Sequence, residues 1–177
     1  MKQFRKSLLS CLGWLAASEL LCLVLAFSFA ILRPEWIRWL SMGCGITAHV
    51  LLMGNCGQAL AKRHTALFHQ SGTRISSGFP VLLAFCTALP LWILYAILWA
   101  NADSSAVLNG FLLLNAPYIQ LHRLLLNGAE PFSAVPLPRQ ILMGLPPLVT
   151  AASVYIGYRL HYAKGIAEIR SRQHNPS

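Results

Sequence analysis

The sequence predicts an all-α membrane protein: a polytopic helical bundle of four transmembrane helices, with an amphipathic or re-entrant outer helix. Hydrophobic residues make up 56% of the chain and charged residues 11%, whereas soluble domains carry about 25% charged residues. The mean hydropathy is +0.56. Long apolar runs alternate with short polar segments, which is typical of multi-pass membrane proteins. We therefore expect residues 1–177 to form a single integral membrane domain.

The first two predicted spans, residues 8–32 and 39–60, form an antiparallel hairpin because only a short turn joins them. Pro34 in that turn disfavours helical geometry at the residue before it. Basic residues precede the first span, and cytoplasmic segments of membrane proteins are rich in Lys and Arg. The N-terminus is therefore predicted to be cytoplasmic. The polar loop at 61–77 returns to that side, and we expect its histidines, including His64, to be solvated.

The third predicted span covers residues 79–99, and the apolar segment at 106–127 follows it. This segment could be read as a further span, but then the Lys and Arg residues would be divided almost evenly between the two sides. Keeping it outside the bilayer obeys the positive-inside rule much better. Gln120, Arg123 and Asn127 also share one helical face. We therefore expect an amphipathic or re-entrant helix on the outer surface.

The last predicted span covers residues 141–158 and starts near Pro146, since proline is tolerated in a first helical turn. Basic residues follow it, so both termini are predicted to be cytoplasmic. The number of cysteines is 5, which is odd, and every one lies in an apolar run, so a disulfide framework is not expected. The chain also has no Asn-x-Ser/Thr glycosylation site. These features fit a bacterial cytoplasmic membrane.

One intramembrane polar pair stands out: Glu19, in the middle of the first span, and His49, at matching depth in the second. A charged carboxylate at this depth is costly, so Glu19 should face the bundle and be either paired or protonated. We expect a Glu19–His49 hydrogen bond, with Thr47, Asn55 and Ser18 as auxiliary polar groups. Two interpretations stay open: a structural polar clamp between the first two spans, or a proton-responsive element of an ion path.

The second span also carries a glycine-rich packing face made by Gly43, Gly45, Gly54 and Gly57. Small residues let membrane helices approach closely, which favours their association. Packing within the chain is the simpler interpretation. A homo-oligomer, or a docking face for another membrane protein, is the alternative.

A further stripe of the second span, Met42, His49, Met53 and Cys56, has side chains that suit a soft metal ion. A single helix cannot enclose a metal, however, and the other predicted spans offer no matching set. Adjustable packing by Met and Cys explains the stripe without a metal. We expect no metal and no cofactor.

The sequence favours a non-enzymatic accessory or interaction subunit of a membrane complex, because it contains no nucleophile motif and no phosphate-binding loop. The alternative is a small oligomeric proton-linked transporter or channel that uses Glu19 and His49. The expected partners are the lipid bilayer and either a membrane protein or further copies of the chain. Nucleic acid is not expected, since the basic residues lie at the ends of apolar runs rather than in a soluble patch.

Overall fold

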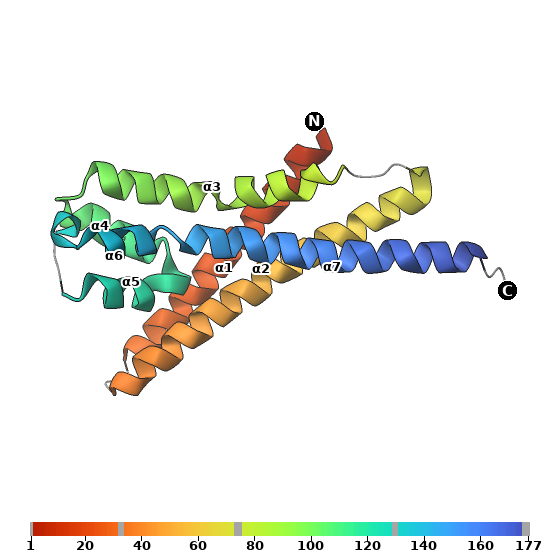
Figure 1. Ribbon diagram of the computed structural model, residues 1–177. Coiled ribbons are helices and arrows are strands. Elements are labelled where there is room, and N and C mark those ends of the chain that lie inside the picture. Colours follow the sequence, from red (N-terminus) through yellow and green to blue (C-terminus); the bar gives the residue numbers. More distant parts are fainter. Residues whose placement is uncertain (1, 32–33, 73–75, 129–130, 175–177) are drawn as a thin grey trace.

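The computed structural model describes residues 2–31, 34–72, 76–128 and 131–174, and this part of the chain is helical without any strand (Figure 1). Four long helices make up most of it. They are α1 (Lys2–Ala30), α2 (Glu35–Ser71), α3 (Gly78–Ala100) and α7 (Pro146–His174). Shorter elements lie between α3 and α7: α4 (Ser105–Leu113), η1 (Ala116–Tyr118), α5 (Ile119–Leu126), η2 (Phe132–Ala134) and α6 (Leu137–Met143). The all-α prediction is confirmed.

The long helices alternate in direction along the chain up to α3, and α7 then runs alongside α2 in the same direction (Figure 1). Three ring contacts fix one end of the bundle. Phe79 at the start of α3 lies 5.7 Å from Phe4 and 5.2 Å from His64, measured between ring centroids. His64 in turn lies 5.5 Å from Tyr158 of α7. The start of α1 and the later parts of α2 and α7 therefore share one end, and the short helices occupy the other.

Three stretches are long and apolar enough to cross a membrane: Gln3–Ala30, Gly78–Ala100 and Leu137–Ile169. They coincide with the first, third and fourth predicted spans, although the end of the first, at residue 32, lies outside the described residues. The second predicted span, in α2, is not among them, because Thr47, His49 and Asn55 interrupt its apolar residues. Four spans thus stay a prediction, whereas three apolar helices are observed.

Helix α2 extends further than the apolar pattern suggests, to Ser71. The prediction of a loop from residue 61 is therefore wrong for residues 61–71, which are helical, and of its two histidines only His69 is exposed. His64 is fully buried there, and its Nδ1 lies 3.0 Å from the Tyr158 hydroxyl. Packing of this face against α7 keeps the polar segment helical, which a local hydropathy pattern does not reveal.

Helices α2 and α7 approach most closely at a contact that we call the α2–α7 seam, made by Gly54, Gly57, Val154 and Gly157. A Cβ added to Gly57 would overlap the carbonyl oxygen of Val154 and lie 2.7 Å from the amide nitrogen of Tyr158. A Cβ on Gly157 would likewise overlap the Gly54 carbonyl. The two backbones can touch only because these positions are glycine.

The four glycines of the predicted packing face therefore lie in different surroundings. Gly57 lies in the seam, and Gly54 contributes its carbonyl to it. Gly45 faces another element, the backbone of Pro117. Gly43 is exposed, and a Cβ there would meet nothing within 4 Å.

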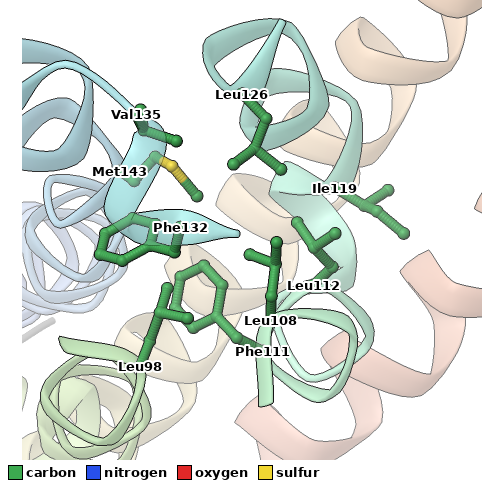
Figure 2. Packing of buried hydrophobic residues seen from close by; sticks show 9 residues of the cluster. All are labelled: Leu98, Leu108, Phe111, Leu112, Ile119, Leu126, Phe132, Val135 and Met143. Atoms are coloured by element: carbon green, nitrogen blue, oxygen red, sulfur yellow. The ribbon is translucent and has the colours of Figure 1, made fainter. Parts of the chain in front are cut away.

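The short elements α4 to α6 form what we call the end cap, residues 105–128 and 131–143, which has its own hydrophobic core. Figure 2 shows Leu108, Phe111 and Phe132 close together, with Leu98 from the end of α3 beside them, whereas Ile119 points to the other side. The members are Leu98, Leu108, Phe111, Leu112, Ile119, Leu126, Phe132, Val135 and Met143. His122 is also buried in the cap, and burial lowers its pKa to about 4, so its imidazole is neutral at pH 7.

In the end cap, two segments that the sequence predicted to be continuous are interrupted. Residues 106–127 do not form one continuous helix, because α4 ends at Leu113 and Pro117, which lacks an N–H, lies in the η1 turn before α5. The last long helix begins at Pro146, as expected for a first-turn proline. Residues 141–143 of the predicted last span lie within the apolar stretch Leu137–Ile169, but they belong to α6, which ends before α7 begins.

Candidate functional site

The centre of the bundle holds a fully buried histidine, His49, with both ring nitrogens bonded. Its Nδ1 lies 2.8 Å from the Ser18 Oγ of α1, and its Nε2 lies 2.8 Å from the Thr150 Oγ1 of α7. A neutral imidazole has one donor and one acceptor nitrogen, and a hydroxyl can serve either role. Both hydrogen bonds can therefore form with either tautomer, and they link α1, α2 and α7.

The neighbouring carboxylate, Glu19, is half-buried and faces a different element. Its Oε2 accepts a hydrogen bond from the backbone N–H of Ala116 at 3.0 Å, while its Oε1 has no partner among the described residues. The direct Glu19–His49 hydrogen bond expected from the sequence is not formed. Successive helical residues point about 100° apart, so Ser18 faces His49 and Glu19 faces the next element around α1.

That element is the η1 turn, which enters the bundle between α1 and α2. Asn115, Ala116, Pro117 and Tyr118 are all buried. The carbonyl oxygen of Pro117 lies 3.1 Å from the position that a Cβ on Gly45 would take, so Gly45 makes room for the turn. None of these four residues was expected at the site from the sequence.

The η1 turn also completes the surroundings of His49. The Tyr118 ring meets the His49 imidazole edge-on, with centroids 5.5 Å apart. The Asn115 Nδ2 donates to the Phe111 carbonyl at 3.0 Å, which satisfies one carbonyl where α4 ends. Non-helical backbone needs such partners when it lies away from water. Proline and asparagine within an apolar run were the available sequence signal for this irregular segment.

The auxiliary residues Thr47 and Asn55 lie on the opposite side of α2. Both are exposed, as are Gly43 and Leu51, whose side chain is 61% exposed. These four residues follow one another at intervals of four and form what we call the outer stripe of α2. Thr47 and Asn55 therefore contribute nothing to His49, and the expectation that they would assist it is wrong.

The four residues of the soft-metal stripe do not all lie in the same surroundings. His49, Met53 and Cys56 are buried, and the Cys56 thiol lies 3.4 Å from the Cys11 sulfur. Met42 instead lines a pocket near the end cap. Within the described ranges, no group of three or more His, Cys, Asp or Glu residues could hold a metal ion.

The polar residues predicted to share a face of the outer helix lie on α5 and at the residue directly after it. Gln120, Arg123 and Asn127 all line a pocket of about 700 Å³, together with Arg38 of α2. The structure thus brings this predicted set together at the far end of the bundle from the chain termini.

The hydrogen bonds of His49 to Ser18 and Thr150 can hold α1, α2 and α7 in register. The Glu19 carboxylate can hold the η1 turn in place by accepting the Ala116 N–H. Comparisons of the chain with protein-family models, curated proteins and solved structures found no match.

Proposed function

We propose that the chain is a small multi-pass membrane protein that acts as a non-enzymatic interaction subunit of a membrane complex. In this proposal α1, α2, α3 and α7 cross the membrane and both termini are cytoplasmic. The cytoplasmic assignment follows from the excess of basic residues at that end. The end cap then lies at the outer surface, with the η1 turn re-entering the bundle.

The outer stripe of α2 carries the proposal. An asparagine amide such as Asn55 is poorly accommodated by hydrocarbon, since its hydrogen-bonding groups find no partner there. Asn55 is nevertheless exposed within the predicted second span, residues 39–60, on the same face as Gly43 and Thr47. Small residues let a second helix approach, and asparagine hydrogen-bonds across such an interface. The stripe therefore suits another helix rather than lipid.

Mild-detergent purification of the tagged chain, with native mass and identification of copurifying proteins, tests this proposal. We expect a stoichiometric membrane-protein partner that is lost with Asn55→Leu. Ser28→Leu is the matched control, since Ser28 is also an exposed polar residue but lies on α1. A homo-oligomer that dissociates with Asn55→Leu would identify the second helix as that of another copy. A monomeric wild-type chain would contradict the proposal.

The topology has its own test with an impermeant thiol reagent applied to intact cells. Arg139→Cys, in the end cap, should react, whereas Lys62→Cys, near the opposite end of α2, should react only after lysis. Both residues are exposed. The reverse labelling pattern would contradict the cytoplasmic termini.

The second candidate, a small oligomeric proton-linked transporter or channel, is favoured by one observation. The Glu19 Oε1 is buried without a hydrogen-bond partner among the described residues. Carboxylates of this kind mark proton relays in membrane proteins. pH-driven flux in vesicles that disappears with Glu19→Gln would support this candidate, and the absence of flux would reject it.

A further inference from the structure

The pocket beside the end cap has a composition that differs from the rest of the bundle. It has a volume of about 700 Å³, within the range typical of small-molecule sites. The end of α1, the first turns of α2, and α5 with the residues after it provide its lining. The α1–α2 hairpin and the end cap are thus brought together around one cavity.

The polar lining of this pocket is basic. Arg38 comes from α2 and Arg123 from α5, and both are exposed. Gln120 and Asn127 supply amide groups beside them. No carboxylate from the described part of the chain is among the lining residues. Guanidinium groups bind phosphate through paired, charge-assisted hydrogen bonds, so this set of side chains suits a phosphate.

Apart from Ser41, the remaining lining is apolar and includes Trp39 and Leu124. Both side chains are largely exposed, Trp39 at 58% and Leu124 at 52%. Indole rings favour the headgroup layer of a bilayer. A free anion would gain nothing from these apolar groups, whereas a lipid would place its phosphate on the arginines and its glycerol and first methylenes on the apolar part.

We propose that this pocket binds the phosphate headgroup of an anionic glycerophospholipid, held by Arg38 and Arg123. The lipid would join the α1–α2 hairpin to the end cap. This site does not depend on the outer stripe of α2, so lipid binding and partner capture can succeed or fail separately.

The experiment measures lipid adducts of the full-length chain by native mass spectrometry in detergent. The probes are phosphatidylglycerol and phosphatidylcholine with matched acyl chains. We expect phosphatidylglycerol to bind at least tenfold more tightly. Arg38→Gln and Arg123→Gln should each weaken its binding about tenfold, because each substitution removes charge-assisted hydrogen bonds to the phosphate. Arg38→Lys and Arg123→Lys, which keep the charge, should retain part of the affinity.

Arg139→Gln is the matched control, since it removes the same charge from an exposed position in the end cap that does not line the pocket. Equal weakening by Arg139→Gln would overturn the proposal, because attraction to the overall charge would then suffice. Equal binding of phosphatidylcholine would overturn it as well. Inorganic phosphate that binds as tightly as phosphatidylglycerol, and is lost in the same variants, would assign the pocket to a free anion and overturn the lipid.

Discussion

The inward and outward faces of α2 carry similar residue types, but those on the inward face are packed and those on the outward face are exposed. Inside, His49 has a partner for each ring nitrogen, and Gly57 lies against the backbone of α7. Outside, Asn55 is exposed, and Gly43 has open space beside it. The inward face is completed by the chain itself, whereas the outward face has polar and small residues to which the described part of the chain contributes no second helix.

This difference shows that polarity and glycine content alone do not identify the core of a membrane bundle. A buried polar group stabilises a fold when its hydrogen bonds are made, and an exposed one in hydrocarbon favours association. Substitutions of the same kind on the two faces should therefore act on different properties, namely folding on the inward face and assembly on the outward face.

The largest effect is expected from Gly57→Ala. The new methyl group would overlap the Val154 carbonyl, so the helices must separate, and we expect a loss of about 3 kcal/mol in the free energy of unfolding. Unfolding in mixed micelles by a denaturing detergent, followed by circular dichroism, provides the measurement.

Gly43→Ala is the matched control on the outward face. It meets nothing within 4 Å, and alanine is intrinsically the better helix former by about 1 kcal/mol. We expect an unchanged or slightly raised stability of the isolated chain. Equal losses for the two variants would show that the two faces of α2 do not differ in packing.

The next effect is expected from His49→Leu. The hydroxyls of Ser18 and Thr150 would both lose their partner in the buried centre, and we expect a destabilisation of about 2 kcal/mol. Asn55→Leu, the same kind of change on the outward face, should alter the stability of the isolated chain by less than about 0.5 kcal/mol. The same unfolding assay compares the two, and a larger loss for Asn55→Leu would reverse the assignment of the faces.

The sequence predicted the place of each long helix because each one contains an apolar run, although α2 continues past its run to Ser71. The third span, predicted at residues 79–99, coincides with the apolar helix Gly78–Ala100, and Pro146 was correctly placed at the start of the last helix. Apolar length and proline chemistry are local properties. They can be read without knowing what a helix packs against.

The sequence did not predict which side of each helix faces inward. Helix α1 is apolar nearly all round, so no polar stripe distinguishes the Ser18 side from the Glu19 side. The η1 turn was missed for a related reason. Its burial depends on the room left by Gly45 and on an acceptor at Glu19, which lie in other helices.

A smaller effect is expected from Thr150→Val, which removes one hydroxyl and keeps the side-chain shape. His49 would lose a single hydrogen bond, and such bonds in membrane proteins contribute about 0.6 kcal/mol on average. Ser153→Ala serves as the control, since the Ser153 hydroxyl bonds only the carbonyl of Val149 in its own helix. In a double-mutant cycle with Ser18→Ala, a coupling near zero would indicate that the two hydrogen bonds act independently.

The smallest effect on stability is expected from Glu19→Gln. The amide oxygen can still accept the hydrogen bond that Glu19 Oε2 accepts from Ala116, so unfolding should change by less than about 0.5 kcal/mol. Glu19→Leu removes the acceptor and leaves a backbone N–H without a partner, which should cost about 1–3 kcal/mol.

The contrast between these two variants tests the role of Glu19 as the acceptor for the Ala116 N–H in the η1 turn. If Gln and Leu destabilised the chain equally, the carboxylate charge rather than the acceptor oxygen would matter. Glu19 would then belong with groups that serve proton movement, and the transporter would become the stronger of the two functional proposals.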